Sequence, residues 1–454
     1  MAEVSQRKRI WGWWFFDWAS QPYHTLLVTF IFGPYFATVA AEFFAAEGLA
    51  EGAAKARAQS AWAMCMTLSG LVIAFGAPIM GAMADTTGRR MPWIWLFSVM
   101  YVIGSAALWF TYPDGSTMWW ALIAFGFGFV GAEYALIFIN SQLPDLGSDD
   151  EVGEISGSGF AFGYLGGFVS LLIMLLLLAE QPNGKTLIGL DPILGLDAAT
   201  REGTRAVGPL SALWFALFMV PYFLWMRDPP GRKGGSFGDA IRSLIALVAS
   251  LKHRMSLTAY LGSSMFYRDA LNGLYGFGGT YAVLVLDWSV VQVGTFGIIA
   301  LVSSVLFSWA GGKADRRFGP KPVIIAAILV LMGVCTVVVG MTREQLFGMP
   351  LAPGSGLPDT IFMTCGALIG GLGGVVQAAS RSLMVRHTEA ENATEYFGLY
   401  GLSGRATSFI APALIGVVTA ATGSVPLGMA PVIGLFAIGL ILLIWVKAEG
   451  DRTA

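Results

Sequence analysis

Charged side chains are scarce in this sequence. Asp, Glu, Lys and Arg make up 12% of its 454 residues, while apolar types make up 56%; a soluble domain carries about 25% charged residues. A water-facing surface cannot be built from so few charges, so lipid must cover much of the apolar surface. The formal net charge of −2 excludes the strongly basic surface that a nucleic-acid partner would require.

Groups that bind metals, cofactors or nucleotides are also scarce. The three cysteines, Cys65, Cys335 and Cys365, lie in separate apolar stretches without metal-ligand spacing, which indicates small apolar residues rather than redox or metal groups. The sequence contains no phosphate-binding P-loop, so it predicts no ATPase of its own. We expect no metal, no cofactor, no paired nucleophile and base, and therefore no enzyme.

Long apolar stretches dominate what is present. A membrane-spanning helix needs about 20 apolar residues, and the chain offers six such stretches, a polar linker, and six more. The predicted spans are Trp11–Ala41, Ala61–Met80, Pro92–Phe110, Met118–Ile139, Ile155–Leu178, Pro209–Met226, Ser256–Leu286, Val291–Ala310, Pro322–Gly340, Ile361–Ser380, Phe397–Ala420 and Gly428–Val446. This pattern predicts a six-helix domain over residues 1–226, a linker over 227–255 and a second six-helix domain over 256–454.

The distribution of Lys and Arg predicts the orientation in the membrane. With both termini cytoplasmic, 19 of the 27 Lys and Arg residues fall in cytoplasmic segments, six on the opposite side and two inside spans. Because cytoplasmic loops carry the excess of positive charge, we expect a multi-pass protein of the cell membrane with both ends in the cytoplasm. The linker repeats apolar residues at helical spacing from Phe237 to Leu251, which favours a helix lying on the membrane surface over a thirteenth span.

The two halves repeat one another. A shift of 241 residues superposes Ser141 on Ser382 and Gly163 on Gly404, at the junction of the fourth and fifth spans of each half. A second pair of matching segments follows the second span of each half. Parallel six-helix repeats that enclose a site at mid-membrane are a transporter architecture.

That second pair is GAMADTTGRR and GGKADRRFGPK. The first copy resembles the loop between spans two and three of the major facilitator superfamily, where the resemblance implies a conformational latch. The second copy has an extra residue before its second glycine and a proline where an arginine is usual, so its latch is expected to be weaker. The predicted latch residues are Gly81, Asp85, Gly88, Arg89, Arg90, Gly311, Asp315 and Gly319.

Four patches resemble a narrower group, the unknown-major-facilitator family related to the fungal vacuole effluxers. They are WGWWFFDWASQPYHTLLVTFIFGPYF (Trp11–Phe36), NSQLPDLGSDDEVGEISGSGFAFGYLGG (Asn140–Gly167), FYRDALNGLYGFGGTYA (Phe266–Ala282) and QAASRSLMVRHTEAENATEYFGLYGLSGRATSFIAP (Gln377–Pro412). The resemblance implies an all-α membrane protein with twelve transmembrane helices in two pseudo-symmetric six-helix bundles, the major facilitator fold. It implies amino-acid efflux only through the vacuolar relatives.

Ionisable groups inside spans are costly and therefore candidates for function. Asp17, Glu133, Arg268, Asp269 and Arg405 are such groups, and their formal charges sum to −1. In one interpretation a carboxylate exchanges a proton while an arginine holds an anionic group of the substrate. In the other, buried ion pairs lock helices together, which we favour for Arg405.

Other polar groups inside spans have the same two interpretations. Arg268 and Asp269 are consecutive and point about 100° apart, so they cannot share one partner. Asn272 is a further substrate candidate, and a protonated Glu133 would couple transport to a proton gradient. His24 is interpreted as a structural hydrogen-bonding residue.

We therefore expect a secondary transporter that moves a small solute by alternating access between spans one, four, seven and ten. Proton coupling and amino-acid efflux fit this prediction, and a sugar, a drug or an organic ion fits the same residues. A sensor without transport on the same fold is the remaining alternative. We expect a monomer whose partners are the solute, protons and the lipid bilayer.

Overall fold

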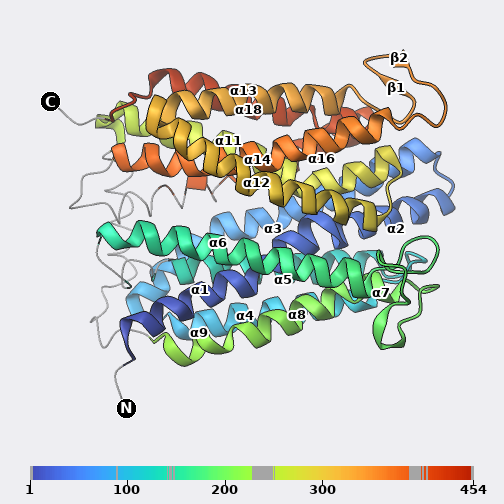
Figure 1. The fold of residues 1–454 in the computed structure, drawn as a ribbon, viewed down its shortest axis with the longest axis horizontal. Coiled ribbons are helices and arrows are strands. Elements are labelled where there is room, and N and C mark those ends of the chain that lie inside the picture. The colour runs from blue at the N-terminus through green and yellow to red at the C-terminus, as the bar shows by residue number, and fades with distance from the viewer. Residues whose placement is uncertain are drawn as a thin grey trace.

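The computed structural model describes residues 4–87, 90–140, 142, 146, 149–227, 249, 251–387, 400, 403–404 and 407–450. Long helices run side by side, and both chain ends lie at one end of the bundle (Figure 1). We call that end the terminal face. The opposite end, the loop face, carries a long loop before α7 (Glu202–Arg205) and a small antiparallel hairpin, β1 (Gln345–Leu346) and β2 (Met349–Pro350).

The helices follow the predicted apolar stretches. In the first half they are α1 (Gln6–Pro22), the π-helix η1 (Tyr23–Phe30), α2 (Phe32–Ala46), α3 (Glu51–Thr87), α4 (Met91–Ala107), α5 (Met118–Asn140), α6 (Asp149–Ile173), the π-turn η4 (Met174–Leu178), α8 (Val207–Phe218) and α9 (Val220–Trp225). In the second half they are α11 (Met255–Leu286), α12 (Val290–Phe318), α13 (Pro320–Val339), α14 (Leu357–Arg386), α16 (Ile410–Thr422), α17 (Val425–Gly428) and α18 (Ala430–Leu442).

Apolar length explains most of these elements. Within the described part of the chain, seven helices are long and apolar enough to cross a membrane, and three shorter apolar helices accompany them. The first is a 41-residue unit from Gln6 to Ala46, which the sequence predicted as one span without its π-helical middle. The linker predicted as a surface helix lies outside the described residues, apart from Ala249 and the segment from Leu251 onward.

Packing divides the helices into two groups. In the first half, α1 packs on α6, α8 and α9, and α4 packs on α5 and α8. In the second, α12 packs on α14 and α11 on α18. The groups meet where α3 packs on α16 and α2 on α11, and Figure 1 shows α11 to α18 as one layer above α1 to α9.

Glycines set close approaches between helices along α6 and α14. A Cβ at Gly163 would lie 3.2 Å from the backbone oxygen of Asp17, and one at Gly370 would lie 2.5 Å from that of Ala300. The helix backbones therefore touch along α1–α6 and α12–α14, which is how small residues associate helices in lipid.

Candidate functional site

Asp17 lies on the face of α1 that packs against α6. A Cβ at Gly159 would lie 2.7 Å from its Oδ2 atom, so the missing side chain makes room for the carboxylate. Across the boundary between the two halves, Asp17 interacts electrostatically with the guanidinium of Arg381 in α14. An acid of one half therefore faces a base of the other.

Uncharged polar groups complete this site. Gln377 lies one turn before Arg381 on α14, and its side chain approaches the hydroxyls of both Tyr164 in α6 and Tyr275 in α11. Tyr164 also interacts electrostatically with Asp17 and Arg381. We call Asp17, Tyr164, Arg268, Tyr275, Gln377 and Arg381 the central polar cluster.

Arg268 enters the cluster from α11. Its Nη1 donates to the carbonyl oxygen of Tyr400 at 3.0 Å, and its Cζ lies 4.4 Å from the centre of that ring. Asn272 and Tyr275 follow four and seven residues later, which places them on the same face of the helix. Asn272 is exposed and Arg268 half-buried, so this face of α11 presents polar groups that are not fully buried.

Asp269 points elsewhere, as the 100° separation predicted. Its side chain is fully buried, and Oδ2 accepts a hydrogen bond from the backbone N–H of Ala411 at 2.8 Å. Ala411 is the second residue of α16, where the helix dipole favours a negative group. The other oxygen, Oδ1, has no hydrogen-bond partner among the described residues. Asp269 thus ties α11 to the start of α16 and does not join the central polar cluster.

Glu133 pairs with a residue that the sequence analysis set aside. Its Oε1 lies 3.4 Å from Nε2 of His24, which belongs to η1, the π-helical middle of the first span. His24 follows Asp17 by seven residues, two helical turns and about 10 Å along the axis. That spacing was the signal in the sequence that could have placed His24 on the same helix face as Asp17.

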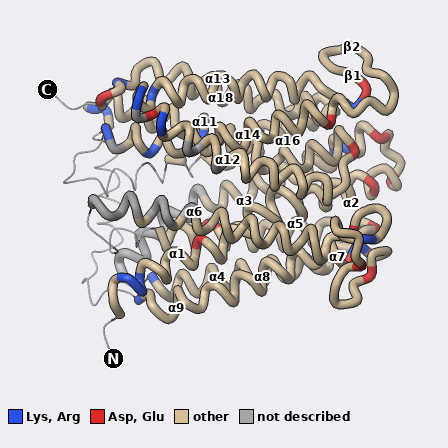
Figure 2. The backbone as a smooth tube through the Cα atoms, viewed as in Figure 1, with Lys and Arg blue, Asp and Glu red and all other residues tan. Residues whose placement is uncertain are grey.

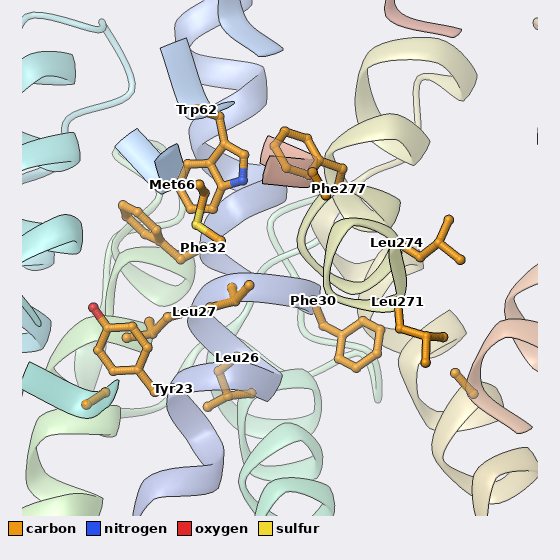
Figure 3. Packing of buried hydrophobic residues seen from close by; sticks show 14 of the residues in the cluster. Tyr23, Leu26, Leu27, Phe30, Phe32, Trp62, Met66, Leu271, Leu274 and Phe277 are labelled. Atoms are coloured by element: carbon orange, nitrogen blue, oxygen red, sulfur yellow. The ribbon is translucent and has the colours of Figure 1, made fainter. Parts of the chain in front are cut away.

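An apolar layer covers the central polar cluster on the side of the loop face. Figure 3 shows Phe30 and Trp62 of the first half near Leu271 and Phe277 of α11. The indole N–H of Trp62 donates to the carbonyl oxygen of Gly276 at 3.2 Å, which joins α3 to α11 across the layer. Apolar side chains from both halves therefore pack together in this layer.

Polar contacts between the halves close the loop face itself. Lys55 Nζ lies 2.8 Å from Asp287 and 3.0 Å from Glu51. Burial acts to lower the pKa of Lys55, but the hydrogen bonds to both carboxylates outweigh it and the pKa is raised. One turn further, the fully buried amide of Gln59 donates to Thr419 Oγ1 at 2.6 Å.

The predicted latch residues lie at the terminal face. Gly319 separates α12 from α13 with φ +82°, and its N–H donates to the Asp315 carbonyl oxygen at 2.7 Å. Gly311 packs against Val375 of α14, and Arg90 directly precedes α4. In the first copy, Gly81 and Asp85 belong to α3. The surroundings of these two positions lie outside the described part of the chain, as do Gly88, Arg89 and the predicted span residue Arg405.

Comparison with known proteins gives the family. Residues 5–454 match the sequence profile of the family described as "Vacuole effluxer Atg22 like". An uncharacterized MFS-type transporter of Bacillus subtilis (strain 168), YxiO, is 24% identical over 96% of this chain and 94% of its own length. Autophagy-related protein 22-1 of Neosartorya fischeri is 23% identical over 66% of this chain and 49% of its own length. The chain therefore spans about half the length of such fungal relatives.

Solved structures agree on the fold. A D-xylose–proton symporter matches 99% of this chain and 100% of its own with a TM-score of 0.67 and 11% identity. A bacterial homologue of the human lysosomal transporter Spinster matches the same shares with a TM-score of 0.62 and 14% identity. These likenesses confirm the predicted all-α major facilitator fold. The match over nearly the whole chain makes this protein a member of the Atg22-like vacuole effluxer family and a membrane transporter of the major facilitator type.

Proposed function

We propose that the protein is a secondary transporter of zwitterionic solutes of the amino-acid class, bound at the central polar cluster and moved by alternating access. The observation that supports this most directly is the electrostatic interaction between Asp17 and Arg381, one from each half of the chain. A solute ammonium group would bind Asp17, and its carboxylate would bind Arg381, whose planar fork suits two parallel hydrogen bonds. Gln377, Tyr164, Tyr275 and Asn272 would contact the rest of the solute.

The formal charges in the cluster favour a carboxylate-bearing solute. Asp17 contributes −1, and Arg268 and Arg381 together contribute +2, so the site has a net charge of +1. A sugar would leave this charge uncompensated in apolar surroundings, and an organic cation would increase it. A zwitterion that places its carboxylate between the arginines satisfies both signs of charge.

The experiment is uptake of labelled amino acids by purified protein in liposomes, with competitors that remove one charge at a time. We expect amino acids to compete, while their methyl esters and the carboxylic acids without the amine compete at least ten times less well. Asp17→Asn removes a charged hydrogen-bond partner worth about 1.5–3 kcal/mol and is expected to raise KM at least tenfold. Asp191→Asn, at an exposed position of the loop face, is the matched control and should leave KM unchanged.

Two outcomes would contradict the proposal. One is the absence of flux above empty liposomes under any imposed gradient, which would favour a sensor. The other is competition by sugars or organic cations but not by amino acids. Wild-type flux in Asp17→Asn would leave that residue only a helix-packing role.

We also propose the orientation and organisation predicted from the sequence. The basic residues of the described chain gather at the terminal face, while acidic and basic residues mix at the loop face (Figure 2). This distribution supports cytoplasmic termini in a cell membrane. The two repeated halves of the sequence suggest a monomer with moving units formed by residues 1–226 and 256–454, joined by 227–255. The contacts that close the loop face leave the central polar cluster to be reached from the cytoplasmic side.

The paired loops at the terminal face would act as latches in this scheme. Asp85→Ala is expected to slow turnover without loss of solute binding, since Asp85 does not belong to the central polar cluster. Solute binding measured by thermal stabilisation separates the two effects, and a collapse of affinity would refute the latch role.

A further inference from the structure

We propose that His24 and Glu133 form the site that carries the coupled proton, separate from the site that binds the solute. This inference rests on the proposed transport function and adds a specific coupling pair to it. The two side chains come from η1 and α5, both inside the apolar spans, with 3.4 Å between Nε2 and Oε1. A histidine and a carboxylate in contact at this depth are costly to bury unless they have a role.

Binding of one proton changes the net charge of the His24–Glu133 pair by one. A neutral imidazole beside a carboxylate carries −1, and one added proton brings the pair to zero, whichever atom holds it. The zero-charge state is the one that apolar surroundings tolerate best. The pair is therefore suited to hold one proton during the part of the transport cycle in which it is covered.

The His24–Glu133 pair is not sealed inside the protein. The side chains of His24 and Glu133 are 38% and 14% exposed. Asp269 is fully buried and held by the backbone of Ala411. Asp17 is also partly exposed, but it interacts with Arg381 and is assigned to the solute. A proton carrier must release its proton in at least one state, so a partly exposed pair outside the solute site suits that role.

The surroundings of the pair are otherwise weakly charged. The elements packed against η1 are α1, α2, α6, α8, α11 and α12. The charged side chains that they place within the spans, among those described, are Asp17 from α1 and Arg268 and Asp269 from α11. Other titratable groups nearby are engaged with backbone, since the Tyr23 hydroxyl donates to Phe125 O at 2.7 Å and Cys65 Sγ to Leu122 O at 3.2 Å.

Geometry links the proton to the solute. His24 lies on the same helix face as Asp17, about two turns further toward the loop face, and Glu133 belongs to the same half of the chain. The π-helical segment that holds His24 widens the helix at this point, and such segments are frequent at functional sites. A proton held by the pair can therefore move together with Asp17, because all three residues belong to the first half of the chain.

The test compares exchange with net transport in proteoliposomes that contain a pH-sensitive dye. Exchange of labelled for unlabelled amino acid needs no release of the proton, whereas accumulation driven by a pH gradient does. We expect His24→Gln and Glu133→Gln to keep exchange within about threefold of wild type. Both should lose pH-driven accumulation at least tenfold, together with solute-dependent proton flux. Glu133→Asp should restore part of the coupling.

His253→Gln, at an exposed histidine of the terminal face, is the control and should behave as wild type. Proton flux that stays coupled to solute in His24→Gln and Glu133→Gln would overturn the inference, as would wild-type transport that is indifferent to a pH gradient. Loss of exchange along with coupling in both variants would also overturn it, since the pair would then serve binding or folding. Absence of all amino-acid flux in wild type would instead refute the proposed function.

Discussion

Gly279 of α11 offers the sharpest perturbation of the contact between the halves. It lies against the first span, where a Cβ would overlap the carbonyl oxygen of Thr29 and lie 2.8 Å from Pro34 Cγ. The obstructing oxygen belongs to the backbone and cannot swing aside. Gly279→Ala must therefore push α11 away from the first span. Gly278→Ala is a control one residue away, because a Cβ there meets no described atom within 4 Å.

The size of the effect follows from the overlap. Overpacking by one methyl group at a rigid contact costs about 1–3 kcal/mol. Because the contact lies between the halves and on the loop-face side, that cost falls on the arrangement in which the loop face is closed. The ratio of open to closed loop face should then rise about 5- to 150-fold. Gly278→Ala should change it by less than twofold.

Spin labels at Gly52→Cys and Thr422→Cys measure this ratio. These exposed positions lie on α3 and at the end of α16, which pack together in the closed loop face, and the native cysteines are buried. We expect the distance distribution of Gly279→Ala to gain a longer component that Gly278→Ala lacks. An unchanged distribution in Gly279→Ala would show that this contact does not limit opening and would refute the reasoning.

Three further predictions concern contacts of different burial. Asp287→Asn removes a partly exposed ion pair with Lys55 worth at most about 1 kcal/mol. In the same spin-label assay it should therefore open the loop face less than Gly279→Ala does. The difference between Asp287→Asn and wild type should disappear in high salt. Glu180→Gln weakens the hydrogen bonds that the buried Glu180 carboxylate accepts from Arg201 and Thr204 at 2.7 Å each. Thermal unfolding in detergent should then show a loss of about 2–4 kcal/mol in the free energy of unfolding. No loss would mean that the loop before α7 does not stabilise the first half. Gly370→Ala crowds the α12–α14 seam and should cost about 1–3 kcal/mol in that assay, whereas Gly333→Ala, with no described atom within 4 Å, should be neutral.

Much of the fold could be predicted because lipid imposes a length and an apolar composition on each span. The 100° separation of Arg268 and Asp269 was also predictable, since it needs only helical geometry. Their partners were not, because Tyr400 and Ala411 lie more than 130 residues further along the chain. Whether two distant polar groups meet depends on how each helix is rotated about its axis, and no local pattern in the sequence states that rotation.

The central polar cluster illustrates the same limit. Asp17 and Arg268 are conspicuous in the sequence because a charged residue in an apolar span is unusual, whereas Tyr164 and Tyr275 resemble ordinary aromatic residues of a span. Gln377 joins them only because α6, α11 and α14 converge. His24 was interpreted as structural because its partner, Glu133, lies on another helix. The pairing became visible only when α1, η1 and α5 were placed side by side.

The π-helical turn in the first span has a consequence for the family history of this chain. Its backbone bonds skip one residue more than those of an α-helix, as in the bond from Ile31 N to Leu26 O at 3.0 Å. A relative with a regular helix here would need one residue fewer between Asp17 and Tyr35, so an alignment of relatives should show single-residue gaps in this window. Deleting one residue from Tyr23–Phe30 would turn α2 by about 100° and carry the Tyr35 hydroxyl away from Thr111 O, which it meets at 2.8 Å. An ancient one-residue insertion would thus have allowed the part of this span before the π-helix to pack on α6 while the part after it packs on α11.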